Sequence, residues 1–247
     1  MKDEDINMSK EKLYYFPYAG ASTATFKNWN SYFGDDITFE VLDYPGHGKR
    51  VFEDYCNSVH EICDDIYSVI RKNYEEGQKY YFAGHCLGGL IIYELCQMIQ
   101  DKHEMEMPNM IFVSGHGAPD KVVNEGIAKM DDMTMLEYLN KQGAVDSALL
   151  DDDFRELVTD IVIPPIRKDA EVYENYTINS NYRIPKVNLS VLYGTSDWKS
   201  PMEEIQRWKD FVDGIVELYP FNGGHYFINS MTEEYLSLIK KLIIQNR

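Results

Sequence analysis

Short apolar segments alternate with segments of helical spacing along most of the chain. The apolar segments are nearly continuous in character, as in strands that are covered on both faces of a parallel sheet. Six segments are predicted to be strands: 12–18, 38–44, 79–85, 110–116, 188–194 and 214–221. Helical periodicity predicts helices over 58–73, 88–100, 203–212 and 232–245, the last with Ser230 and Thr232 as candidate caps. This alternation predicts an α/β fold with a mostly parallel central sheet flanked by helices.

Residues 120–185 break the alternation, because they contain no convincing strand. Apolar residues recur there at helical spacing in two groups: Met130, Met133, Leu136 and Leu139, then Phe154, Leu157, Val158 and Ile161. The prolines of "IPPIRKD" predict a break after the second group. About 65 residues with so little apolar content are poorly suited to folding alone. We therefore expect residues 1–247 to form one domain with a helical lid inserted at approximately 120–185, rather than two domains.

Bulk composition excludes several classes of protein. The formal net charge of −17 argues against nucleic acid or an anionic membrane as a partner, since those ligands need clustered Lys and Arg. No apolar run approaches the roughly 20 residues of a membrane-spanning helix, and the N-terminus lacks the apolar region of a signal peptide. We expect a cytoplasmic protein. The four cysteines, Cys56, Cys63, Cys86 and Cys96, match no metal-site spacing, so neither a metal nor a cofactor is expected.

The stretch "GHCLGGL", residues 84–90, lies between the predicted strand "KYYFA" and the helical pattern "LIIYELCQMIQ". Gly84 and Gly88 flank Cys86 with the spacing of a nucleophile elbow, in which glycines permit a strained strand-to-helix turn. Gly89 adds room for close approach of the backbone. A helix N-terminus favours the thiolate, which is the reactive form of cysteine. We therefore predict that Cys86 is a nucleophile rather than a buried structural cysteine.

A nucleophile of this kind needs a base, and His225 is the best placed of the six histidines. It lies in "FNGGHYF", directly after the last predicted strand, where a glycine-rich loop can return the imidazole over the sheet edge. His85 adjoins Cys86, but its side chain should point away from the cysteine on an extended backbone. The remaining histidines have no comparable placement: His47, His60, His103 and His116.

The acid that orients the base is predicted to be Asp197 in "YGTSDW", at the carboxyl end of the strand 188–194. Asp120, after "GHGAP", is the competing candidate. The order Cys86, Asp197, His225 is the nucleophile–acid–base order of α/β-hydrolases. The oxyanion hole is expected to use the N–H of Leu87 and a second N–H from "PYAGAS", with Ala19 preferred and Gly20 the alternative.

With these pieces placed, the chain resembles the type II (external) thioesterases that accompany nonribosomal peptide and polyketide synthases. Related enzymes are the medium-chain acyl–carrier-protein thioesterases of fatty acid synthesis. The resemblance runs nearly from end to end and is carried by these segments: "FPYAGASTATFKNW", "LDYPGHGKR", "GHCLGGLIIYEL", "FVSGHGAP", "PPIRKD" and "FNGGHYFI". The sequence departs from the family pattern at Tyr18, where histidine is usual, at His47, where arginine is usual, and at Cys86, where serine is usual.

The resemblance implies hydrolysis of acyl groups from the phosphopantetheine arm of an acyl or peptidyl carrier protein, in nonribosomal peptide or polyketide biosynthesis. It carries over to Cys86 as nucleophile, His225 as base and Asp197 as acid. The cysteine is compatible with a native hydrolase, with an acyltransferase that passes the acyl group to an amine or thiol, and with a serine-to-cysteine exchange that traps the acyl-enzyme. A non-catalytic module that binds an acyl chain or a carrier is the alternative from another class. Arg167, Lys168, Arg183 and Lys186 are candidates for a basic carrier-docking patch, or are ordinary solvated surface.

Overall fold

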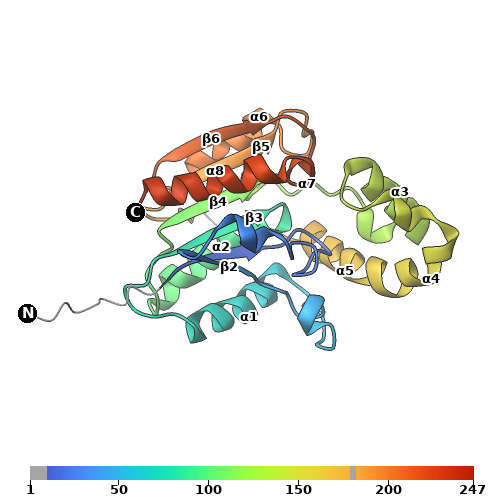
Figure 1. Ribbon diagram of the computed structural model, residues 1–247, viewed down its shortest axis with the longest axis horizontal. Coiled ribbons are helices and arrows are strands. Elements are labelled where there is room, and N and C mark those ends of the chain that lie inside the picture. Colours follow the sequence, from blue (N-terminus) through green and yellow to red (C-terminus); the bar gives the residue numbers. More distant parts are fainter. Residues whose placement is uncertain (1–9, 179–181) are drawn as a thin grey trace, which may run out of the picture.

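The computed structural model describes residues 10–178 and 182–247 and has a parallel sheet at its centre (Figure 1). The strand order in space is β2-β1-β3-β4-β5-β6, and every neighbouring pair is parallel. The strands are β1 Glu11–Phe16, β2 Ile37–Val41, β3 Tyr80–His85, β4 Met110–Ser114, β5 Asn188–Gly194 and β6 Val216–Phe221. All six predicted strands are present, with ends that differ by up to three residues.

Burial explains why the central strands are nearly continuous in apolar character. Every residue of β3 and β4 is buried, because helices cover both faces of the sheet there. The edge strands β2 and β6 are largely half-buried or exposed. In the register of the sheet His85 pairs with Ser114, and Gly194 pairs with Phe221. The loops that follow these four strands therefore all leave from the carboxyl end of the sheet.

Two layers of helices cover the sheet. The α-helices of the whole described chain are α1 Val59–Lys72, α2 Leu87–Lys102, α3 Asp132–Gln142, α4 Arg155–Leu157, α5 Ile163–Glu174, α6 Met202–Gln206, α7 Phe227–Ser230 and α8 Thr232–Gln245. Helices α1, α2 and α6 share one apolar core with the sheet, and α7 and α8 share the other. Short 3₁₀ turns lie at Trp29–Tyr32, Gly48–Arg50, Ile127–Lys129, Ser147–Leu150, Asp152–Phe154 and Arg207–Asp210.

Helices α3, α4 and α5 form a separate layer between β4 and β5 in the chain, here called the helical segment, from Ile127 to Glu174. Figure 1 shows it beside one end of the sheet. It has a small apolar cluster of its own, made of Met135, Leu136, Leu139, Val158, Ile163 and Ile166. The segment thus has its own packing, although its cluster is much smaller than the two cores at the sheet.

The predicted break at the prolines of this segment is wrong. Pro164 and Pro165 lie in the first turn of α5, and a π-helical turn at Val158–Val162 leads directly into that helix. Proline is tolerated in a first helical turn because its missing N–H has no intrahelical partner there. The wider π turn, closed by a hydrogen bond from Ile163 N–H to Val158 O, takes up the change in backbone geometry.

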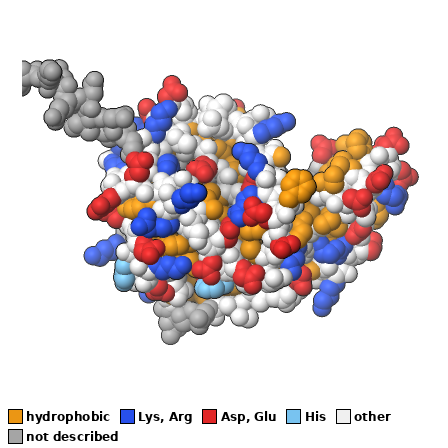
Figure 2. Space-filling view, turned by 90° about the horizontal axis from the view of Figure 1, so that it is seen from below, with side chains coloured by type: hydrophobic (Ala, Val, Ile, Leu, Met, Phe, Trp, Pro, Cys, Tyr) orange, Lys and Arg blue, Asp and Glu red, His pale blue; other side chains and the backbone are white. Residues whose placement is uncertain are grey.

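The second apolar group of the helical segment, predicted from its helical spacing, is only partly buried. Val158 is buried, whereas Phe154, Leu157 and Ile161 are 43%, 41% and 61% exposed. Figure 2 shows hydrophobic side chains among acidic ones on the projecting lobe that this segment forms. Helical spacing by itself does not reveal whether a partner layer is present to cover the stripe.

Two other local predictions need correction. The region 203–212 is a short α6 followed by the 3₁₀ turn Arg207–Asp210, not one helix. Helix α8 is capped at Met231, and neither Ser230 nor Thr232 caps it with its side chain. The hydroxyl of Ser230 donates to Phe227 O, and that of Thr232 donates to Ile228 O. Both carbonyls belong to the short preceding helix α7, whose last carbonyls have few partners within the helix.

Within residues 10–178 and 182–247, none of the helices combines the length and the apolar character that a membrane crossing requires. Residues 1–9, which entered the expectation about a signal peptide, lie outside the described residues.

Candidate active site

Cys86 lies at the sharp turn between β3 and α2. Its backbone has φ 51° and ψ −114°, a conformation that is strained for any residue other than glycine. Its N–H donates to Ser114 O at 2.9 Å, and its carbonyl accepts from Gly89 N–H at 2.9 Å. These bonds tie the turn to β4 on one side and to the first turn of α2 on the other. The thiol is therefore held at the N-terminus of a helix and at the carboxyl edge of the sheet.

The glycines around this turn allow segments of backbone to approach more closely than any side chain would permit. A Cβ on Gly88 would lie 2.1 Å from Phe16 O, and one on Gly84 would lie 2.7 Å from the backbone carbonyl carbon of Gly88. The helix thus begins in direct backbone contact with β1 and β3, which only glycine permits.

We expect Gly88→Ala to destabilise the fold by about 3 kcal/mol or more, because the backbone of β1 cannot move away from the new methyl group. Urea unfolding of the variant measures this. Gly224→Ala is the matched control, since no atom lies within 4 Å of the position that its methyl group would take. Equal stability of the two variants would contradict the packing argument.

His225 and Asp197 meet in the loops that follow β6 and β5. His225 Nδ1 lies 2.9 Å from Asp197 Oδ2, and the two residues are 2% and 5% exposed. Asp197 Oδ1 accepts a second hydrogen bond from Lys199 N–H at 3.0 Å. The other ring nitrogen, His225 Nε2, is buried and has no hydrogen-bond partner of regular geometry. The carboxylate therefore fixes the ring and leaves Nε2 available.

The electrostatics of this pair favour an imidazolium. Burial works against the charge on His225, but the neighbouring Cys86 side chain and the Asp197 carboxylate outweigh it and raise the pKa of His225 to about 9. Burial likewise acts to raise the pKa of Asp197, but the hydrogen bond from His225 dominates together with the positive charge and lowers it. The three groups are close enough to act as one charge network.

This network predicts how stability changes with pH. The pKa of His225 is about 9 in the folded protein, against about 6.5 for a free imidazole. The imidazolium therefore stabilises the folded state fully below pH ~6.5, and this contribution is lost as the pH rises through about 9. The unfolding free energy of the parent relative to His225→Gln is expected to fall by about 2 kcal/mol between pH ~7 and ~10. Urea denaturation across that range measures it, and a constant difference would contradict it.

A cavity of ≈ 50 Å³ opens at Cys86 and His225. Ala19 and Leu87, the two residues predicted to supply the oxyanion hole, line the same cavity. Within the part of the chain that the structure describes, neither of their amides donates a hydrogen bond to another protein group. The rest of the wall includes residues of the helical segment, among them Leu139, Ile166 and Tyr173. The cavity therefore lies between the sheet edge and that segment.

His116 was given no role from the sequence, but it lines this cavity. Its Nδ1 lies 2.7 Å from Gly117 O and its Nε2 lies 3.2 Å from Tyr173 Oη. Burial lowers its pKa to about 4, so it is neutral at pH 7. His116 lies just beyond the carboxyl end of β4, as Asp197 lies just beyond the carboxyl end of β5. That position in the sequence could have identified His116 as a residue of the site.

His85 is packed beneath the base. Its ring centroid lies 5.1 Å from that of His225, and its Nδ1 lies 3.0 Å from Ser114 Oγ. Burial, with the nearby His225, holds the pKa of His85 well below its usual range. Tyr18 lies edge-on to His85, with ring centroids 5.8 Å apart. His85 therefore supports the position of His225 as a neutral ring.

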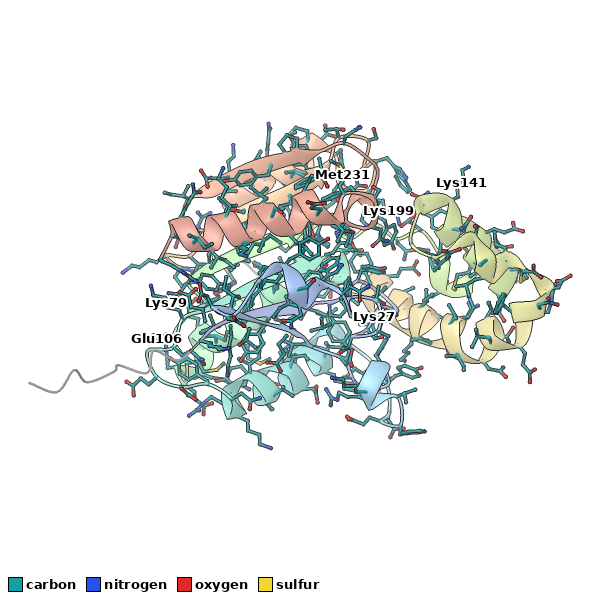
Figure 3. The ribbon with its side chains drawn as sticks, viewed as in Figure 1. Lys27, Lys79, Glu106, Lys141, Lys199 and Met231 are labelled. Atoms are coloured by element: carbon teal, nitrogen blue, oxygen red, sulfur yellow. The ribbon has the colours of Figure 1, made fainter. Side chains whose placement is uncertain are left out.

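Glu125 and Lys199 form a largely buried ion pair in the cavity wall that sequence reasoning missed. Glu125 Oε1 lies 2.7 Å from Lys199 Nζ, with side chains 12% and 8% exposed. Tyr138 of α3 donates its hydroxyl to the same carboxylate. Figure 3 labels Lys199, which lies between the sheet and α3. Glu125 lies two residues before the helical segment, so the pair and the bond from Tyr138 together link the loop of Asp197 to that segment. No periodicity or motif in the sequence indicates this link.

The competing acid, Asp120, does not join this network. It forms an ion pair with Arg207 and is partly exposed.

The charges of the candidate basic docking patch are largely neutralised by acidic residues of the same protein. Arg167 pairs with Asp132 at 2.7 Å, and Arg183 pairs with Asp213 at 2.6 Å. Lys168 contacts Glu171 at 3.3 Å.

The sheet order, the turn at Cys86 and the loops of His225 and Asp197 are those of an α/β-hydrolase fold. The chain belongs to the thioesterase domain family, which matches residues 11–243.

Individual relatives cover most of the chain. It is 26% identical to Thioesterase PikA5 of Streptomyces venezuelae, over 97% of this chain and 83% of that protein. Among solved structures it is similar to ClbQ from the colibactin NRPS/PKS pathway, with 28% identity, a TM-score of 0.86 and coverage of 96% and 98% of the two chains. RedJ, a thioesterase from the prodiginine pathway of Streptomyces coelicolor, shares the fold at 21% identity, with a TM-score of 0.84 and coverage of 94% and 85%. The family match and the similarity to PikA5 support a hydrolase of the thioesterase type.

Proposed function

We propose that the protein is a type II thioesterase that hydrolyses acyl groups from the phosphopantetheine arm of carrier proteins, in nonribosomal peptide or polyketide biosynthesis. The observation that supports it most is one cavity holding the thiol of Cys86 and the unpartnered Nε2 of His225, whose Nδ1 faces Asp197 at 2.9 Å. Two relatives support the substrate class: PikA5 is named as a thioesterase, and ClbQ comes from an NRPS/PKS pathway.

The proposed reaction has two stages. The Cys86 thiolate attacks the carbonyl carbon of the thioester, and the pantetheine sulfur leaves with a proton from the His225 imidazolium. Water then attacks the carbonyl carbon of the Cys86 acyl-enzyme and gives a proton to His225 Nε2. The bond between the acyl carbon and the Cys86 sulfur breaks, so the carboxylic acid leaves and the Cys86 thiolate is regenerated. In both stages the N–H groups of Ala19 and Leu87 stabilise the oxyanion. Cysteine takes the place of the usual serine, so the first stage exchanges one thioester for another and is nearly thermoneutral.

The helical segment acts as the lid over this site, in a single domain. Its residues form part of the cavity wall, and Tyr138 of α3 bonds to Glu125, which pairs with Lys199 in the loop of Asp197. A cavity of ≈ 50 Å³ holds only a few water molecules, so in this arrangement it suits the thioester group with a short acyl chain. Longer chains need the segment to move outward.

The test is to incubate the protein with an acyl-pantetheine thioester and to follow free thiol, free acid and intact protein mass. Thiol and acid released in equal amounts over many turnovers support hydrolysis. An acyl adduct that persists until an amine or thiol is added supports an acyltransferase instead. Binding without any thiol release would leave a non-catalytic module and contradict the proposal.

A further inference from the structure

The loop after β1, which contains Ala19 and Gly20, is held by a side chain from the helical segment. Gly20 N–H donates to Asp169 Oδ2 at 2.8 Å, and Asp169 lies on α5. Gly20 has φ +76°, and a Cβ there would lie 2.2 Å from Ile166 Cγ1, also on α5. The helix therefore lies directly against the loop and bonds to it.

Asp169 is only 2% exposed, so its charge needs a partner. That partner is His47, which is 3% exposed and places Nε2 3.0 Å from Asp169 Oδ2. The other nitrogen, Nδ1, lies 3.0 Å from Pro45 O. Nδ1 thus has a hydrogen-bond partner, whereas Nε2 meets Asp169 at ion-pair distance without regular hydrogen-bond geometry. A ring with a proton on each nitrogen would place a positive charge at that contact.

The surroundings of His47 support a charged ring. Burial opposes the charge, but Asp169 outweighs it, with help from Pro45 O and Asp43, and the pKa of His47 is raised. The rings of Tyr44 and Tyr55 lie edge-on to the imidazole, at centroid distances of 5.9 and 5.5 Å. Asp169 is thus held between the imidazole of His47, whose protonated form these surroundings favour, and the backbone amide of Gly20.

We propose that Asp169, with His47 as its counter-charge, is a positioning residue that holds the loop of Ala19 and Gly20 for stabilisation of the oxyanion. The proposal rests on the proposed function, in which the adjacent amide of Ala19 is a donor. Gly20 N–H is already used by Asp169, and this bond orients the neighbouring Ala19 N–H in the cavity. Oxyanion donors act only when they are pre-aligned, and a displacement of about 1 Å costs roughly 100-fold in rate.

The test compares two reactions of the same sulfur. Acylation of Cys86 by an acyl-pantetheine thioester develops an oxyanion, whereas alkylation by iodoacetamide does not. Both are followed in single-turnover experiments, with peptide mass spectrometry to separate Cys86 from the half-buried Cys56. Asp169→Asn keeps the size of the side chain and removes its charge. It is expected to slow acylation by roughly 10- to 100-fold and to leave alkylation within about threefold of the parent rate, since the proposed nucleophile and base are unchanged.

Three further variants sharpen the result. Asp132→Asn is a control. Asp132, in α3, pairs with Arg167, which lies on the same helix α5 as Asp169. Its loss leaves the bond from Asp169 to the loop intact and should keep both rates near the parent values. His47→Gln should slow acylation as Asp169→Asn does, and His47→Arg, which keeps the positive charge, should restore most of it. If Asp169→Asn does not fold, as judged by circular dichroism, the two His47 variants decide the question.

The proposal is overturned if Asp169→Asn acylates at the parent rate, or if acylation and alkylation slow equally. It is also overturned if His47→Arg and His47→Gln lose acylation to the same extent. A parent protein that forms no acyl adduct at Cys86 would instead remove the proposed function, and with it the basis for this role of Asp169.

Discussion

Cys86→Ala is expected to lower kcat/KM for an acyl-pantetheine thioester by at least about 1,000-fold. Without the sulfur no acyl-enzyme can form, and the reaction is left to direct attack by water. Residual activity would come from His225 and the oxyanion donors, which remain in place. The measurement is the rate of thiol release in steady state, together with intact protein mass to detect the acyl adduct.

Cys56→Ala is the matched control for that experiment, because Cys56 is the other thiol of the chain that is not fully buried. It should react at the parent rate and acquire the same adduct. Cys86→Ser adds a comparison of the two nucleophiles at one turn. Hydroxyl oxygen is the weaker nucleophile and depends more on His225, so its acylation should be slower. A Cys86→Ala protein as active as the parent would eliminate the proposed nucleophile.

Asp197→Asn should lower kcat by at least about 100-fold with little change in KM. The carboxylate accepts the hydrogen bond from His225 Nδ1–H and thereby keeps Nε2 free for proton transfer. An amide can present its NH₂ group to Nδ1 instead, which places the proton on the wrong nitrogen. Loss of the negative charge should also lower the pKa of His225, which the carboxylate helps to raise.

The pH dependence of kcat/KM and of Cys86 alkylation measures the Asp197→Asn effect. Asp120→Asn is the control, since Asp120 pairs with Arg207 and is outside the network of His225. Its activity should stay within about twofold of the parent, as expected for a partly exposed ion pair. If Asp120→Asn loses activity and Asp197→Asn does not, the assignment of the acid is wrong.

The chain's local chemistry was sufficient to predict the sheet. Strands such as β3 and β4 are buried along their whole length, and their apolar runs are visible in the sequence. The turn at Cys86 was also predictable, because backbone contacts at Gly84 and Gly88 exclude every other residue type. The positions of His225 and Asp197 followed from one rule, that loops after parallel strands meet at one edge of the sheet.

The helical segment was less predictable, since its contacts are with residues distant in the chain. Proline at the start of α5 suggests a break until the preceding π turn is known. The exposed Phe154 and Ile161 resemble core residues in the sequence, because spacing defines a stripe and not what covers it.

What the sequence by itself determined is the α/β architecture, the strained turn at Cys86 and the chain order of the groups that meet there, since each depends on local spacing and backbone sterics. Only the tertiary structure decided which titratable and charged side chains meet away from solvent, as in the contacts of Asp169 with His47 and of Glu125 with Lys199. Those pairs join segments separated by 122 and 74 residues (169 − 47 and 199 − 125). Electrostatic pairing across such separations depends on the packed fold and has no local signature.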